Sequence, residues 1–149
     1  MFVDRYERLR RYSGAVAKKL VPKPTDAELA ILRVLWAKGP STVRQVHDVL
    51  SAGRELAYTT TLKLLQIMTD KGLTIREEQM RSHVYAARHG EDETQKRLVG
   101  DLLDRAFGGS AAKLVLQALA TTRASADDLR EIRRLLDEHA ARPSKGERA

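Results

Sequence analysis

Apolar residues recur every three or four positions along most of this chain, a spacing that predicts amphipathic helices. The first helix is expected to begin after Thr25, because Thr25 and Glu28 have the residue types and the spacing of a capping box. Gly39 and Pro40 then predict its end. The apolar bulk of this helix comes from five residues: Leu29, Leu32, Val34, Leu35 and Trp36. We expect Trp36 to belong to the core rather than to stack on a base.

A second, shorter helix is predicted over residues 43–50. Ser41 and Thr42 precede it, and short hydroxyl side chains cap helix amino-termini. The stretch 51–53, Ser-Ala-Gly, is expected to break it. Four residues should face inward: Val43, Val46, Val49 and Leu50.

A third helix is predicted between Leu56 and Gly72, with Gly72 as its carboxyl-terminal stop. Thr61 lies at the margin of its apolar face. The residues of that face are Leu62, Leu65, Met68 and Thr69. Three short helices with a tight break between the last two predict a helix-turn-helix arrangement.

The spacing changes from helical to alternating after Gly72. Leu73 and Ile75 alternate with polar residues, and so does the run 83–87. Between them lies the polar stretch 78–82, so the pattern predicts a β-hairpin. A hairpin directly after the third helix would be the wing of a winged helix.

From Glu91 the pattern is helical again, interrupted by Gly108-Gly109 and followed by caps at Ser110 and Ser125. A helix as apolar as 113–120 must be covered on most of its circumference. A second copy of the chain would cover it, whereas the alternative is a core formed within one chain. The expected dimer contacts are Leu98, Leu102, Phe107, Leu114, Leu116, Leu119, Leu129, Ile132 and Leu136.

These elements predict a mainly α-helical protein with a small β-hairpin wing. A winged helix-turn-helix domain (25–90) would precede a helical dimerisation domain (91–140) and a tail (141–149). Residues 1–24 would form a basic amino-terminal extension. Three interpretations of this extension stay open: a disordered tail, an arm on the DNA backbone and a docking helix.

The net charge of +7 is distributed unevenly. Residues 1–25 carry seven Lys or Arg and two acids, residues 26–90 carry nine and seven, and residues 91–149 carry eleven of each. A basic balance favours a polyanionic partner, nucleic acid first and an anionic membrane second. The balanced final segment is expected to serve another purpose.

The chain lacks cysteine, which excludes disulfides and thiolate chemistry. No apolar run approaches the roughly 18 to 20 residues that span a bilayer, and the amino-terminus has no signal-peptide pattern, so a cytoplasmic location is expected. None of the four His residues has the paired spacing of a zinc helix, and Ser110 and Ser125 occupy cap positions. We therefore expect no metal, cofactor or enzymatic activity.

The first turn of the third helix contains one aromatic ring and three hydroxyls, from Tyr58 to Thr61, but no carboxylate. Helix amino-termini usually favour Asp and Glu, so this turn suits a phosphate or a base edge. We expect the helix to enter the DNA major groove. The alternative is a surface helix with a Thr-rich start. The expected DNA contacts are Thr42, Arg44, Arg54, Tyr58, Thr59, Thr60, Lys63, Lys71, Arg81 and His83.

Five segments stand in a characteristic order and spacing: 24–36, 42–47, 56–60, 70–73 and 107–116. Together they resemble the penicillinase-repressor family of bacterial transcription regulators, the BlaI/MecI type. The resemblance covers residues 24 to 139. The family implies a winged-helix domain, a helical dimer domain and repression by occupying a palindromic operator, often with a TACA/TGTA half-site core. In its best-known members a membrane-bound sensor protease, or a protease that it triggers, cleaves the dimer domain and releases the DNA.

The chain departs from the family pattern in three respects. Gln117-Ala118 stands where the cleaved members have an Asn-Phe bond, which argues against cleavage with the same specificity. The absence of cysteine argues against the copper-responsive relatives, which carry a cysteine cluster. Thr61 stands where the family usually has a β-branched aliphatic residue, and we expect this to weaken core packing.

The sequence therefore predicts a dimeric repressor that binds an operator and is released by an inducing signal, with a membrane sensor protease as a candidate partner. Two alternatives stay open: a winged-helix regulator that responds to a small ligand, and a winged helix used for protein contact without DNA.

Overall fold

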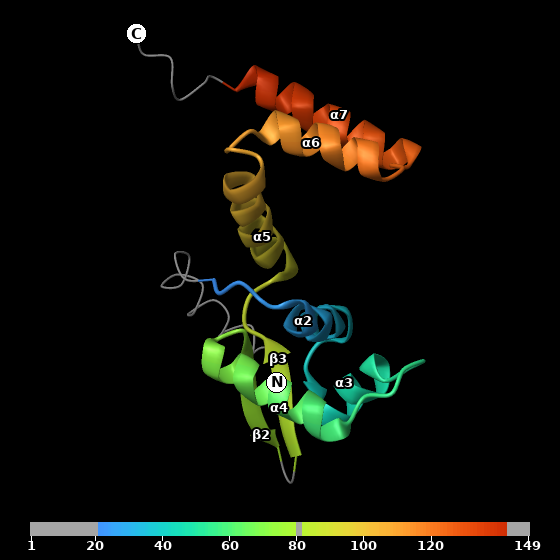
Figure 1. Cartoon of the computed structure of the whole chain (residues 1–149), viewed down its shortest axis with the longest axis vertical. Coiled ribbons are helices and arrows are strands. Elements are labelled where there is room, and N and C mark those ends of the chain that lie inside the picture. Colours follow the sequence, from blue (N-terminus) through green and yellow to red (C-terminus); the bar gives the residue numbers. More distant parts are fainter. Residues whose placement is uncertain (1–20, 80–81, 143–149) are drawn as a thin grey trace. The chain divides into compact units, whose positions relative to one another are not determined.

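The computed structural model describes residues 21–79 and 82–142, and within them it contains six helices and one three-stranded sheet (Figure 1). The chain divides into two compact units, with the boundary between Asp101 and Leu102. The structure confirms a mainly helical protein with a winged helix-turn-helix. The domain boundaries expected at residues 90 and 140 stay a prediction.

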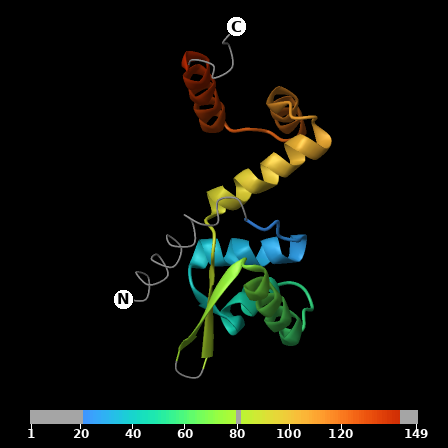
Figure 2. The same cartoon turned by 90° about the vertical axis from the view of Figure 1, so that its left-hand side faces the viewer.

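The first unit combines three helices with the sheet. Its elements are α2 (Asp26–Lys38), β1 (Ser41–Thr42), α3 (Val43–Leu50), α4 (Tyr58–Lys71), β2 (Thr74–Gln79) and β3 (Ser82–Ala87). The strand order is β1-β3-β2, and both pairings are antiparallel. Figure 2 shows the hairpin of β2 and β3 extending away from α2. The two-residue strand β1, in which Ser41 pairs with Tyr85, is too short to leave a pattern in the sequence.

Local chemistry explains where these helices begin and end. A capping box between Thr25 and Glu28 opens α2, as expected, and a second one between Thr42 and Gln45 opens α3. Gly72 ends α4 with a φ of +82°, a left-handed conformation that glycine adopts without steric cost.

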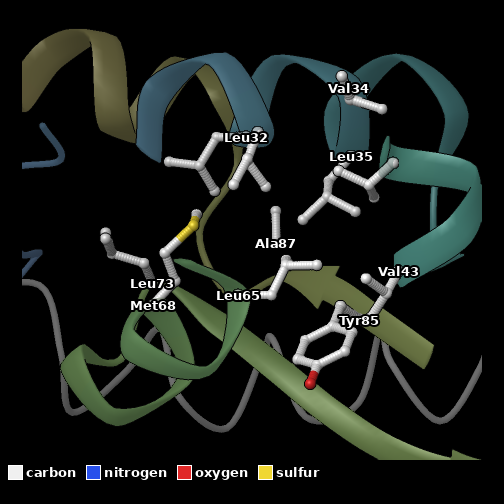
Figure 3. Packing of buried hydrophobic residues seen from close by; sticks show 11 residues of the cluster. Leu32, Val34, Leu35, Val43, Leu65, Met68, Leu73, Tyr85 and Ala87 are labelled. Atoms are coloured by element: carbon white, nitrogen blue, oxygen red, sulfur yellow. The ribbon is translucent and has the colours of Figure 1, made fainter. Parts of the chain in front are cut away.

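The core lies where α2, α3 and α4 meet β3 (Figure 3). Ile31, which the sequence pattern did not single out, is fully buried, and so is Tyr85. Thr61 is also fully buried rather than marginal. The expectation for Val49 was wrong, because 39% of its surface is exposed. Trp36 packs against this core as expected, and its Nε1–H donates to the His89 carbonyl at 3.0 Å.

The carboxylate of Glu28 is buried at the start of α2, where it accepts hydrogen bonds from the Thr25 N–H (3.0 Å) and from Lys71 Nζ (2.9 Å). Burial alone would raise the pKa of Glu28, but the Thr25 N–H and the Lys71 ammonium outweigh it and hold that pKa below its ordinary value. This ion pair joins the beginning of α2 to the end of α4.

Part of the expected extension contacts α5 (Glu91–Ala106). Lys23 forms an ion pair with Asp101 at 2.6 Å, and Arg97 Nε donates to the Val21 carbonyl at 3.3 Å. Pro24 is buried. Residues 1–20 lie outside the described part of the chain, so the three interpretations of the extension stay open for them.

The second unit contains the end of α5, α6 (Ala111–Thr121) and α7 (Ala126–Ala141). Gly108 and Gly109, with φ of 55° and 79°, separate α5 from α6. Ser110 caps α6, and Ser125 forms a capping box with Asp128 at the start of α7. Neither α6 nor α7 has a buried residue within one chain. None of the described helices is long and apolar enough to cross a membrane.

Replacing Glu28 by Gln should lower the free energy of unfolding at pH 7 by about 1–3 kcal/mol, because the Lys71 ammonium loses its charged partner. A carboxyl group whose pKa is lowered by folding stabilises the folded state above its unfolded pKa of about 4.3, and this contribution disappears as pH falls through the folded pKa. The difference between the two proteins should therefore shrink below pH 4. Urea unfolding at pH 3 to 7 measures it.

The exposed Glu55→Gln variant is the matched control and should show no such difference. A Glu28→Gln variant that is as stable as the unsubstituted protein at pH 7 would contradict a stabilising role for the ion pair.

Candidate nucleic-acid interface

The amino-terminus of α4 differs from most other helix starts in this protein. A Thr or Ser side chain caps α2, α3, α6 and α7, but no side chain caps α4, whose N-cap is Ala57. Its first turn has no acidic residue, and Tyr58, Thr59 and Thr60 are exposed. The partial positive charge of the helix end is therefore accessible to an anion or a base edge beside three side chains able to hydrogen-bond.

Side chains of α3 contact the first turn of α4. The Arg44 guanidinium carbon lies 4.8 Å from the centroid of the Tyr58 ring. The His47 and Tyr58 rings meet edge to face, with centroids 5.4 Å apart and planes at 77°. His47 Nδ1 lies 2.9 Å from Thr61 Oγ1. The two helices of the helix-turn-helix are thus joined at the face where we expect DNA.

Three other predicted contacts lie on this helix-turn-helix. Lys63 is exposed on α4. Arg54 is exposed, and its Nε donates to the Leu50 carbonyl at 3.1 Å, which places its guanidinium at the carboxyl end of α3. Thr42 uses its hydroxyl to accept from the Gln45 N–H and its own N–H to donate to Gln45 Oε1. The N–H and the hydroxyl of Thr42 are thus already paired within the chain.

Lys71 does not lie with the other candidates. It is the last residue of α4, about 20 Å along the helix from Tyr58 at 1.5 Å per residue. Its ammonium pairs with the buried Glu28, so the structure gives this charge a partner within the chain. His83 is exposed on β3 beside the end of the hairpin, whereas Arg81 lies outside the described residues.

Two acidic residues of the helix-turn-helix, Asp48 on α3 and Glu55 before α4, are exposed as well. Their charges weaken the long-range attraction between this domain and a polyanion. Hydrogen bonding and shape at the start of α4 are therefore the better source of any sequence preference.

The expected dimer contacts are partly or largely exposed in the single chain. Leu116 is 67% exposed and Leu136 is 58% exposed, on α6 and α7 respectively. Leu102, Leu119 and Leu129 are exposed by 40–48%. The remaining four are of intermediate exposure: Leu98, Phe107, Leu114 and Ile132.

The sequence pattern did not reveal the role of His47 and Thr61 at this site. His47 was considered only as a metal ligand. Thr61 was considered as a first-turn hydroxyl suited to a phosphate or base edge and as a residue that weakens the core, but not as the partner of His47. A polar residue at an otherwise apolar position of α4, together with a histidine on the preceding helix, is the signal that could have indicated their hydrogen bond.

Known proteins with similar sequences match nearly the whole described chain. A family model described as penicillinase repressor matches residues 24–138. A transcriptional regulator BlaI of Mycobacterium tuberculosis is 39% identical over 126 residues, covering 81% of this chain and 91% of that protein. The penicillinase repressor of Bacillus licheniformis is 25% identical over 124 residues, covering 83% of this chain and 97% of that protein.

A solution structure of Bacillus licheniformis BlaI, in its monomeric form and in complex with the blaP half-operator, is 25% identical with a TM-score of 0.43. The match covers 49% of this chain and 89% of the BlaI chain in that structure. The family assignment depends on the sequences and not on this likeness. With a family model spanning residues 24–138 and a relative 39% identical over most of its length, this chain belongs to the penicillinase repressor family.

Proposed function

We propose that this protein is a dimeric transcriptional repressor that binds a two-fold-symmetric operator through the first turn of α4. The observation that carries the proposal is the uncapped, acid-free amino-terminus of α4, where Tyr58, Thr59 and Thr60 are exposed. In a helix-turn-helix this end of the second helix contacts base edges in the major groove. Membership of a family of transcriptional repressors supports the same function.

The side chains at this end suit base recognition. A Thr methyl group contacts a thymine methyl group, and a Thr hydroxyl donates to or accepts from a base edge or a phosphate. Lys63 follows on the same helix, and Arg54 and the exposed His83 are proposed contacts to flanking phosphates. Arg81, which belongs to the wing, keeps the same proposed role.

Dimerisation through α6 and α7 is the second part of the proposal. Exposed leucines on helices without a buried residue are unfavourable in water, and burial of apolar surface yields roughly 25 cal/mol per Å². A second copy of the same helices supplies the missing cover. Two-fold symmetry would also give two recognition helices for two half-sites.

Release of DNA by an inducing signal completes the proposal, with a membrane sensor protease as the candidate partner that the family resemblance implies. Gln117 and Ala118, at the position where cleaved members have an Asn-Phe bond, are both exposed within α6. The sequence contains no asparagine, so a protease specific for Asn-Phe has no site in it, and proteolytic release would need a different specificity.

DNA binding should be specific and sensitive to salt. Fluorescence anisotropy with a duplex selected by the protein from a randomised pool should give nanomolar-range affinity that falls steeply as KCl rises. The double variant Thr59→Ala, Lys63→Ala should bind about 10- to 100-fold more weakly, because it loses base and phosphate contacts. The matched control is Lys96→Ala, which removes an exposed lysine from α5. Unchanged binding by the double variant would contradict the proposed interface.

The Leu116→Asp variant should be monomeric, because it places an unpaired charge in the proposed dimer contact. Leu116 is 67% exposed in the single chain, so the substitution should leave the fold of the monomer intact. Sedimentation velocity measures the mass, and circular dichroism checks the helix content. The control Ala37→Asp changes an exposed residue of α2 and should stay dimeric. If the Leu116→Asp variant dimerises as strongly as the unsubstituted protein, Leu116 is not part of the dimer interface.

A further inference from the structure

The Tyr58 ring is held by two side chains of the preceding helix. Arg44 lies with its guanidinium carbon 4.8 Å from the ring centroid, and His47 meets the ring at 5.4 Å between centroids. Both contacts have a preferred geometry, because a guanidinium favours the face of an aromatic ring and aromatic pairs favour edge-to-face packing. Together they restrict the orientations that Tyr58 can adopt.

His47 is itself fixed by α4. Its Nδ1 lies 2.9 Å from the hydroxyl of Thr61, which is completely buried and therefore needs a hydrogen-bond partner. Thr61 follows Tyr58 by three positions, so both side chains leave the helix on the same side. The contacts thus run from Thr61 to His47, from His47 to Tyr58 and from Tyr58 to Arg44.

This arrangement bears on DNA binding because Tyr58 remains 38% exposed at the start of α4. A ring that is already oriented loses less conformational freedom when it binds than a free side chain does. An oriented ring also presents one fixed shape to the bases, so a wrong base pair cannot be accommodated by rotating the side chain.

We propose that Arg44 and His47 are positioning residues, which fix the Tyr58 ring so that it discriminates between DNA sequences. In this assignment Arg44 acts mainly through Tyr58 rather than as the direct DNA contact that the sequence predicted. The inference rests on the proposed operator-binding function, and it adds the means by which one recognition side chain is held in place.

The choice of arginine makes the assignment testable. A lysine supplies the same charge to a phosphate, but it lacks the planar guanidinium that lies over the ring. Arg44→Lys should therefore keep any phosphate contact and lose the positioning effect, whereas Arg44→Met would also lose a phosphate contact if Arg44 made one.

The test measures binding to two duplexes of about 30 base pairs, long enough for two half-sites one or two helical turns apart. One duplex is selected by the unsubstituted protein from a randomised pool, and the other is a shuffled sequence of the same composition. The ratio of their dissociation constants reports sequence discrimination, and titration at several KCl concentrations reports phosphate contacts. Thermal unfolding checks that each variant is folded.

Tyr58→Ala should lower the discrimination ratio about 10- to 100-fold. Arg44→Lys and Arg44→Met should each lower it by about five- to tenfold, with little change in the salt slope. Neither should lower the ratio further when combined with Tyr58→Ala, because the residue through which Arg44 acts is gone. His47→Asn should also lower the discrimination ratio on its own, and it should cause no further loss when combined with Tyr58→Ala. Arg33→Met, an exposed arginine on α2, is the control and should leave the ratio unchanged.

The inference is overturned if Arg44→Lys discriminates as the unsubstituted protein does, or if Arg44→Met lowers affinity for both duplexes equally and reduces the salt slope by about 0.9. Additive losses in the Arg44 and Tyr58 double variant overturn it as well. If the unsubstituted protein selects no sequence from the pool, that result rejects the proposed operator-binding function itself. The two failures are therefore distinguishable.

Discussion

The burial of Leu65 and Met68 in the core fixes how α4 lies, and the candidate interface depends on that constraint. The two residues occupy one side of the helix, three positions apart, and pack with the buried side chains of α2, α3 and the sheet (Figure 3). With that side buried, the opposite side of α4 and the first-turn residues Tyr58, Thr59 and Thr60 remain exposed. The same packing brings α3 close enough for its side chains to contact Tyr58.

The sequence was informative wherever a boundary depends on neighbouring residues. The Thr25 and Glu28 pair and the glycine at position 72 marked the beginning of α2 and the end of α4, because caps and left-handed stops are local interactions. The alternation after Gly72 revealed the hairpin for the same reason.

Long-range partners could not be predicted in this way. Lys71 seemed available to a phosphate until the structure placed its ammonium on Glu28, which lies 43 positions earlier in the chain. Val49 has helical spacing appropriate to a buried residue, yet no neighbouring element covers it fully. Thr61 was interpreted as a weakness of the core, whereas its hydroxyl lies within hydrogen-bonding distance of His47. In each case the missing information was which element packs nearby.

Neither α6 nor α7 has a buried residue within one chain, so contacts within the second unit contribute little to the stability of these helices. Helices of 11 and 16 residues are close to the length at which isolated helices in water are only marginally formed. If a second copy covers them, as proposed above, that contact supplies much of their stability and obeys mass action. The concentration of the protein would then set how much of α6 and α7 is folded.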